Sequence, residues 1–174
     1  MTHVLRQADP AWSKKKLGSS TIGRVGCLAT VYAQAARALG VDDDCTPVDV
    51  VERGVFRGAA MLQADTAKRM GLVADDVTRA DDVHRRMRDV LTAALAVGDV
   101  VVMHVDHDSS KPDGDPEGDH FVLALRIEGD VIVFADPATG DEERMDLRML
   151  SCSVMWGTRA RRYELRSVRP LRAA

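Results

Sequence analysis

The sequence predicts an α+β fold, with an N-terminal helical half over residues 1 to about 98 and a C-terminal antiparallel β-sheet over residues 99 to 174. Up to residue 98 the apolar residues recur at helical spacing, whereas beyond it they form short continuous or alternating runs. A chain of 174 residues has the size of one domain. We therefore expect residues 1–174 to form a single domain with both halves around a shared core.

Four segments of the first half carry the spacing and the end signals of helices. They are residues 27–39, 46–54, 59–71 and 80–98. The first has an apolar face and stops at Gly40, and the second has Thr46 as its N-cap and Pro47 in its first turn. The last begins with acidic residues, which the helix dipole favours at that end.

The second half contains short apolar runs that are typical of β-strands. They are residues 99–105, 120–127, 131–136, 153–157 and 161–168. The short connection "EGD" after residue 127 predicts that the second and third of these form a hairpin. The segment "PATG" at 137–140 predicts a turn. In the basic C-terminal run "RARRYELRSVRPLR", charged residues alternate with Tyr163, Leu165 and Val168, which predicts a solvated strand face.

Composition excludes several classes of protein. The net charge is −3, and residues of both signs are mixed along the whole chain, so no nucleic-acid-binding surface is expected. Three cysteines without metal-binding spacing argue against a disulfide framework or a zinc site, and no cofactor is predicted. No apolar run reaches the length of a membrane span. The N-terminus lacks the layout of a signal peptide, so we expect synthesis in the cytoplasm and, for any exit, release without a signal or within a larger particle.

A nucleophilic site is predicted from three residues that are far apart in the sequence. Cys27 opens the helix 27–39, where backbone N–H groups and the helix dipole favour a thiolate. His120 begins a strand and Asp136 ends the next strand of the same hairpin, which places both at one edge of the sheet. The alternatives are an inert buried thiol, a structural histidine and an aspartate that only forms a turn, and His104 is a rival base.

The acidic segment "DHDSSKPDGDPEGD" at 106–119 allows a second interpretation. Its six carboxylates and His107 offer oxygen and nitrogen ligands, but the spacing lacks the glycine and terminal glutamate of an EF-hand loop. A solvated, mobile loop beside His120, which gates the site or repels anionic substrates, is the alternative. No metal ligand is assigned.

Four stretches resemble the papain-like cysteine peptidases, in particular the branch of the bacteriocin-leader (double-glycine) peptidases of ABC exporters and their stand-alone relatives. They are "QADPAWSKKKLGSSTIGRVGC", "LATVYAQAARALG", "GDHFVLAL" and "VIVFADPATG", which together frame most of the chain from Gln7 to Gly140. The resemblance implies a papain-like arrangement of the α+β fold, with the nucleophile helix packed on the antiparallel sheet. Ala36 and Arg37 depart from the bulkier apolar residues of many relatives, which puts substrate choice in doubt.

The resemblance also implies roles. Cys27 would be the nucleophile, His120 the base, Asp136 the residue that orients the base, and Gln7 a donor to the oxyanion. The implied function is a cysteine peptidase or amide hydrolase that acts through an acyl-thioester on a peptide leader, a host protein or the peptides of bacterial cell wall, within a phage or secreted assembly. The alternative is a catalytically idle copy of the fold that serves as a binding or structural part of such an assembly.

Overall fold

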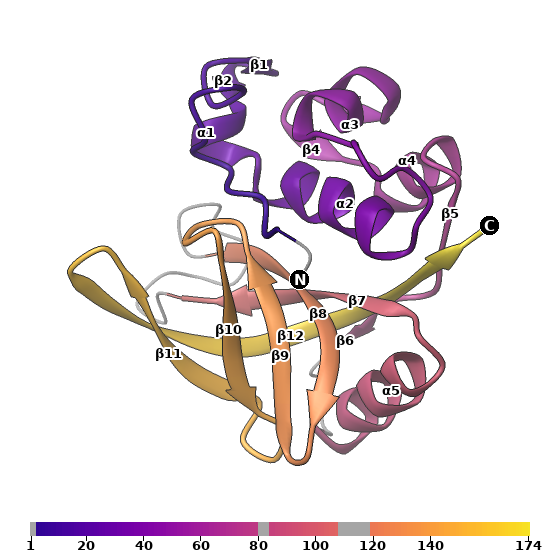
Figure 1. Cartoon of the computed structure of the whole chain (residues 1–174), viewed down its shortest axis with the longest axis vertical. Helices are drawn as coiled ribbons and strands as arrows, with labels where there is room; N and C mark the ends of the chain where they lie inside the picture. Colours follow the sequence, from indigo (N-terminus) through magenta and orange to yellow (C-terminus); the bar gives the residue numbers. More distant parts are fainter. Residues whose placement is uncertain (1–2, 80–83, 108–118) are drawn as a thin grey trace.

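The computed structural model describes residues 3–79, 84–107 and 119–174. Figure 1 shows the elements in chain order: β1 (Lys16–Leu17), β2 (Ser20–Thr21), α1 (Ile22–Val25), α2 (Cys27–Ala38), α3 (Pro47–Arg53), β3 (Phe56–Arg57), β4 (Ala60–Met61), α4 (Gln63–Arg69), β5 (Leu72–Ala74), β6 (Thr78–Arg79), α5 (His84–Ala96), β7 (Val100–Asp106), β8 (Asp119–Glu128), β9 (Val131–Asp136), β10 (Asp141–Asp146), β11 (Ser151–Trp156) and β12 (Arg159–Ala173).

Six antiparallel strands close into a barrel. Strands β7 to β12 pair in sequence order, and β12 then pairs with β7 and completes the ring. Closure depends on the 15 residues of β12, whose first half pairs with β11 and whose second half pairs with β7. A register shift between Leu165 and Ser167 interrupts the pairing with β7, and such a bulge bends a strand and increases its twist.

The predicted α+β fold with its papain-like arrangement is therefore wrong. Of the described residues, 27% are in helices and 40% are in strands, which is a mostly β fold built on a closed barrel. Hydrophobic spacing indicates where strands lie, but it does not show that one strand joins both ends of a sheet. Strands β5 and β6, which come from the first half of the chain, pair with β12 of the second half.

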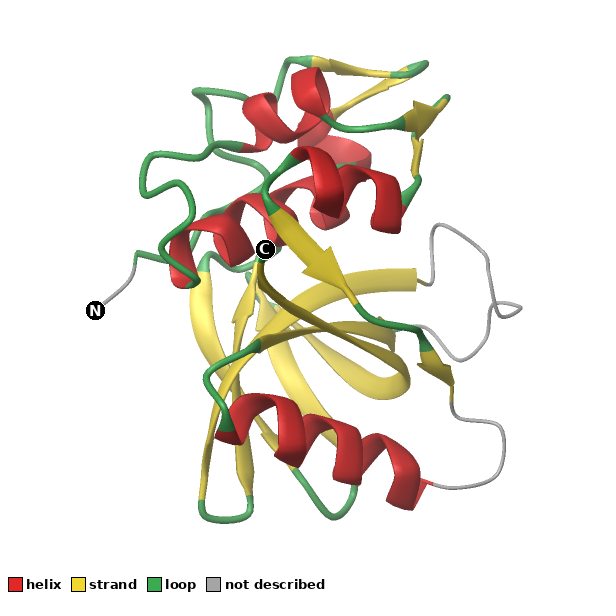
Figure 2. Ribbon diagram, turned by 90° about the vertical axis from the view of Figure 1, so that its right-hand side faces the viewer, coloured by secondary structure: helices red, strands yellow, loops and turns green. Residues whose placement is uncertain are grey.

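Two clusters of buried side chains lie on opposite faces of the barrel wall. Val100 and Val102 of β7 face the cluster around α2, whereas Val101 and Met103 belong to a second cluster that takes residues from all six barrel strands and from α5. Burial on both faces explains why β7 reads as a continuous apolar run. Helices α2 and α5 cover opposite sides of the barrel (Figures 1 and 2).

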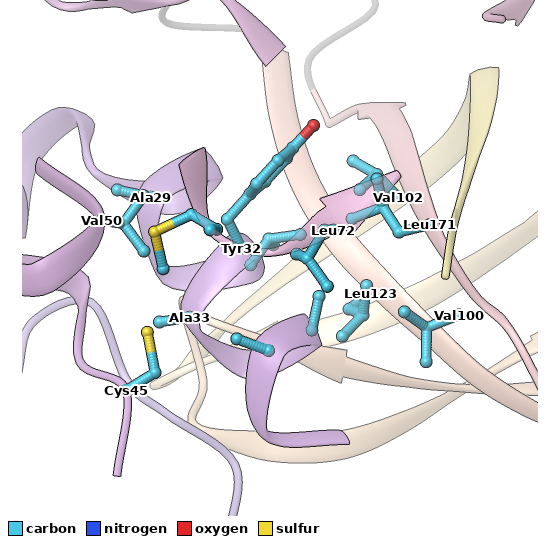
Figure 3. Packing of buried hydrophobic residues seen from close by; sticks show 14 of the residues in the cluster. Ala29, Tyr32, Ala33, Cys45, Val50, Leu72, Val100, Val102, Leu123 and Leu171 are labelled. Atoms are coloured by element: carbon cyan, nitrogen blue, oxygen red, sulfur yellow. The ribbon is translucent and has the colours of Figure 1, made fainter. Parts of the chain in front are cut away.

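Small side chains let α2 approach the barrel closely. Its buried face is rich in alanine and includes Ala29 and Ala33, and the only large aromatic side chain in it is that of Tyr32, which is fully buried. Figure 3 shows Ala29 beside Val50 of α3, and these side chains belong to one buried cluster with Leu123 and Val102 of the barrel wall. The start of α2 is thereby fixed relative to β8.

The structure confirms the predicted helix at 46–54 and corrects the one at 59–71. The hydroxyl of Thr46 accepts the N–H of Asp49 and the side chain of Asp49 accepts the N–H of Thr46, so α3 begins with a full capping box. Helix α4 begins later than expected, because Gly58, with φ of 64°, forms the turn of the small hairpin β3–β4. Residues 80–83 of the fourth predicted helix lie outside the described residues. None of the described helices is both long enough and apolar enough to cross a membrane.

Candidate active site

The side chains predicted to be catalytic meet at one end of the barrel. Strand β8 starts with Asp119 and His120, and β9 ends at Asp136. Because the two strands are antiparallel neighbours, the start of one lies beside the end of the other. His120 pairs with Val105, a residue of the barrel-filling cluster, so its side chain is on the inner face. Helix α2 packs against β8 and begins at Cys27.

His120 and Asp136 form a buried pair. The distance from Nε2 of His120 to Oδ1 of Asp136 is 2.8 Å, and the two side chains are 4% and 0% exposed. The backbone N–H of Ala138 donates to the same oxygen at 2.8 Å, and the hydroxyl of Tyr163 donates to Oδ2 at 2.6 Å. Burial alone would raise the pKa of Asp136, but His120 and these hydrogen bonds outweigh burial and hold that pKa below its ordinary value.

Cys27 is the second partner of the His120 imidazole. Burial lowers the pKa of His120, but interactions with the side chains of Asp136 and Cys27 outweigh it and raise the pKa to about 9. Since Nε2 is bonded to Asp136, Nδ1 is the ring nitrogen left for the sulfur. At neutral pH the ring is therefore a cation between the Asp136 carboxylate and the Cys27 sulfur, which is the arrangement that activates a cysteine nucleophile.

The backbone around Cys27 is tightly constrained. Gly26, the N-cap of α2, donates its N–H to the carbonyl of Ile22 at 2.8 Å, and the hydroxyl of Thr30 donates to the carbonyl of Gly26 at 2.9 Å. A Cβ at Gly26 would lie 2.4 Å from the carbonyl oxygen of Ile22, so no other residue fits there without a shift. Cys27 as a residue is partly exposed and forms no disulfide.

Gln7 connects the two sides of the site. Its backbone N–H donates to the carbonyl of Pro137 at 2.8 Å, directly after Asp136, and its side-chain Nε2 donates to the carbonyl of Gly23 at 3.2 Å, shortly before Cys27. The amide carries a second N–H that this bond does not use. The structure thus places Gln7 beside the predicted site, and its role as an oxyanion donor stays a prediction.

The rival base His104 lies elsewhere. It pairs with Phe121 across β7 and β8, one position away from Val105 and His120, and therefore points to the outer face of the barrel wall. Its ring stacks on Phe121 with 4.9 Å between centroids, and its Nε2 lies 2.9 Å from Oδ1 of Asp119 without the alignment of a hydrogen bond.

Tyr163 and Trp156 are the residues of this site that the sequence analysis missed. In the predicted strand Tyr163 is one of the apolar residues that alternate with the charged ones, and no role in the site was assigned to it; it is fully buried, and burial together with the Asp136 charge raises its pKa. Its oxygen accepts the indole N–H of Trp156 at 2.7 Å, and the indole ring lies edge-on to His120 with 5.4 Å between centroids. Tyr163 lies two residues before Leu165 and therefore on the same face of the strand, where both are buried. Because a buried tyrosine hydroxyl needs a hydrogen-bond partner, this spacing could have indicated a buried polar contact.

The proposal of a metal in the acidic segment stays untested over most of its length, because residues 108–118 lie outside the described residues. At its ends, Asp106 accepts a hydrogen bond from Arg166 at 2.8 Å and Asp119 lies beside His104. His107 contacts Trp156 with 4.8 Å between ring centroids, and burial, followed by the charge of His120, lowers the pKa of His107. In the described part of the chain no three His, Cys, Asp or Glu side chains gather as metal ligands.

Comparisons with known proteins add little. No family model matches the sequence, and no curated protein matches it. Among solved structures, the chain is similar to the Pseudomonas avirulence protein AvrPphB, a papain-like cysteine protease, with 15% identity over 75% of this chain and 61% of that one. The TM-score of 0.29 is too low to establish a common fold, and the bacteriocin-leader branch finds no support.

Proposed function

We propose that this chain is a cysteine peptidase or related amide hydrolase in which Cys27 is the nucleophile, His120 the acid and base, and Asp136 the residue that orients His120. One observation carries the proposal: the His120 imidazole lies between the buried carboxylate of Asp136 and the sulfur of Cys27, a partly exposed residue. Burying a charged pair costs roughly several kcal/mol of desolvation free energy per ion. A protein with a purely structural role therefore gains little stability from such a pair. This cost argues against the catalytically idle alternative.

The geometry supports a two-step reaction. The thiolate of Cys27, paired with the His120 imidazolium, attacks the substrate carbonyl carbon, and the backbone N–H of Cys27, with the second amide N–H of Gln7, would bind the oxyanion. The carbon–nitrogen bond then breaks, and the His120 imidazolium gives its Nδ1 proton to the leaving amine. In the second step neutral His120 takes a proton from water, the resulting hydroxide displaces the sulfur, and the acid product leaves with the thiolate and the imidazolium restored.

An activated ester tests this reaction whatever the natural substrate is. We expect p-nitrophenyl acetate to transfer its acetyl group to Cys27, with a burst of p-nitrophenol and acetylation located by peptide mass spectrometry. The Cys152→Ala variant is the matched control and should keep the burst, whereas His120→Ala should lose it. Acetylation spread equally over the three cysteines, or a burst that survives in His120→Ala, would contradict the proposal.

The natural substrate is a finer proposal that the sequence resemblance supplies. It points to peptide bonds, including those of bacterial cell-wall peptides, and to work within a phage or secreted assembly. Purified peptidoglycan and a peptide library, each incubated with wild type and with Cys27→Ala, separate these substrates. We expect new termini in one of the two with wild type and in neither with Cys27→Ala.

A further inference from the structure

The two oxygens of the Asp136 carboxylate have different partners. Oδ1 faces Nε2 of His120 and the N–H of Ala138, both at 2.8 Å, whereas Oδ2 accepts the hydroxyl of Tyr163 at 2.6 Å. The carboxylate group can rotate only about its Cβ–Cγ bond, and the two bonds on Oδ1 oppose this rotation at one oxygen. The bond from Tyr163 opposes it at the other oxygen.

Trp156 fixes the direction in which Tyr163 donates. An indole N–H can only donate, so the 2.7 Å contact from Nε1 of Trp156 uses the tyrosine oxygen as an acceptor. The tyrosine proton is then directed at the Asp136 carboxylate, its acceptor among the described residues. Trp156 and Tyr163 thus donate in one direction toward Asp136, whose other oxygen accepts the N–H of His120.

The bond between Tyr163 and Asp136 also crosses the barrel. Tyr163 lies on β12, which pairs with β11 and β7 but not with β9, the strand of Asp136. The bond therefore spans the barrel interior between non-neighbouring strands, where both side chains are fully buried. The Trp156 ring also lies edge-on to the His120 imidazole, whose side chain is 4% exposed.

We propose that Tyr163, oriented by Trp156, is a positioning residue that holds Asp136 with Oδ1 toward His120 and thereby keeps Nδ1 of His120 directed at Cys27. The inference rests on the proposed function of Cys27 and His120. Without Tyr163 the carboxylate turns, its bond to the imidazole weakens, and the proton on His120 is held less firmly.

The test is the pH dependence of Cys27 alkylation by iodoacetamide in Tyr163→Phe. Misplacement of a catalytic group by about 1 Å lowers rates by up to about a hundredfold, so we expect alkylation near neutral pH to slow by between about tenfold and a hundredfold. The titration of His120, followed by NMR of its ring protons, should move from about pH 9 to lower pH. Tyr32→Phe is the control, because Tyr32 is equally buried but donates at 3.3 Å to the carbonyl of Gln63.

The possible outcomes separate the two proposals. A Tyr163→Phe protein with a lower melting temperature but an unchanged alkylation profile has lost only a structural contact, and that result overturns the inference. If wild-type Cys27 reacts no faster than in His120→Ala, the proposed function itself fails. Should Tyr163→Phe not fold, Trp156→Phe decides: it removes the donor that orients Tyr163 and keeps an aromatic ring, and an unchanged His120 titration there overturns the inference.

Discussion

The buried His120–Asp136 pair should make stability depend on pH within a defined window. The folded-state pKa of His120 is about 9, whereas its ordinary value is 6.5. A group whose pKa is raised by folding contributes stability that is fully present below its unfolded pKa and is lost as the pH rises through its folded pKa. The gap between 6.5 and about 9 corresponds to about 3 kcal/mol of unfolding free energy, lost between those two pH values.

Urea unfolding of wild type and His120→Gln measures this contribution. Glutamine keeps an N–H donor for Asp136 but does not titrate, so the variant retains the pH dependence of every other group. Between about pH 6 and about pH 9.5, wild type should lose about 3 kcal/mol more than the variant, or roughly 6–12 °C of melting temperature for a domain of this size. Asp136 has the opposite sign: its lowered pKa contributes stability above 3.8, lost as the pH falls through its folded pKa.

The comparison has a clear negative result. If wild type and His120→Gln lose the same unfolding free energy over this window, the imidazole is not held as a cation in the folded protein. If wild type gains stability relative to the variant, burial rather than Asp136 dominates the titration of His120. Either result would remove the electrostatic basis of the proposed site.

Two further substitutions test neighbouring features. Gly26→Ala places a methyl group 2.4 Å from the backbone oxygen of Ile22, so we expect the free energy of unfolding to fall by about 1–3 kcal/mol and the acylation of Cys27 to be lost. At Gly157 an added methyl group meets nothing within 4 Å. Gly157→Ala should therefore lower the free energy of unfolding by about 1–2 kcal/mol through its backbone conformation alone and keep the acylation of Cys27. Gln7→Ala should lower peptide or ester turnover by roughly 10²–10³ and leave the alkylation of Cys27 by iodoacetamide unchanged, because alkylation forms no oxyanion; equal loss in both reactions would show that Gln7 holds the site together instead.

Local features of this fold could be predicted from the sequence because they depend on neighbours in the chain. Thr46 and Pro47 mark the start of α3, and the "EGD" connection, with Gly129 at φ of 62°, marks the hairpin β8–β9. The small hairpin β3–β4 was not predicted, and its second strand fell within the predicted helix 59–71, because strands of only two residues are too short to show an alternating pattern.

Barrel closure could not be predicted in this way. Strand β10 has the sequence "DEERMD", in which Met145 is the one buried side chain, so the strand carries almost no apolar signal. The role of β12 as a partner of both β11 and β7 depends on a bulge after Leu165, and nothing in the local sequence marks it. The local patterns therefore predict an open sheet where the strands form a ring.

The proximity of His120 and Asp136 could be predicted because it too depends on local pairing, whereas the contact of Tyr163 could not. His120 and Asp136 belong to one hairpin, so local pairing alone brings them together, and the structure places them 2.8 Å apart. Tyr163 reaches Asp136 only across the interior of the closed barrel. A sheet without closure leaves that tyrosine on a strand with no route to the carboxylate, and its part in the site was missed with the barrel.

The most direct test of a reactive Cys27 is its rate of alkylation by iodoacetamide relative to the other two cysteines. Burial, aided by Asp42, raises the pKa of Cys45 to about 11, and burial, aided by nearby carboxylates, raises the pKa of Cys152 to about 12. Near neutral pH these thiols hold only about 10⁻⁴ and 10⁻⁵ of thiolate, so both should stay unmodified.

Peptide mass spectrometry after brief exposure at about pH 6, in wild type and in His120→Ala, gives the result. We expect modification of Cys27 alone in wild type and its loss in His120→Ala, with circular dichroism showing that both proteins are folded. Equal modification of the three cysteines, or a Cys27 that reacts as fast in His120→Ala as in wild type, would contradict the central claim that His120 and Asp136 activate Cys27.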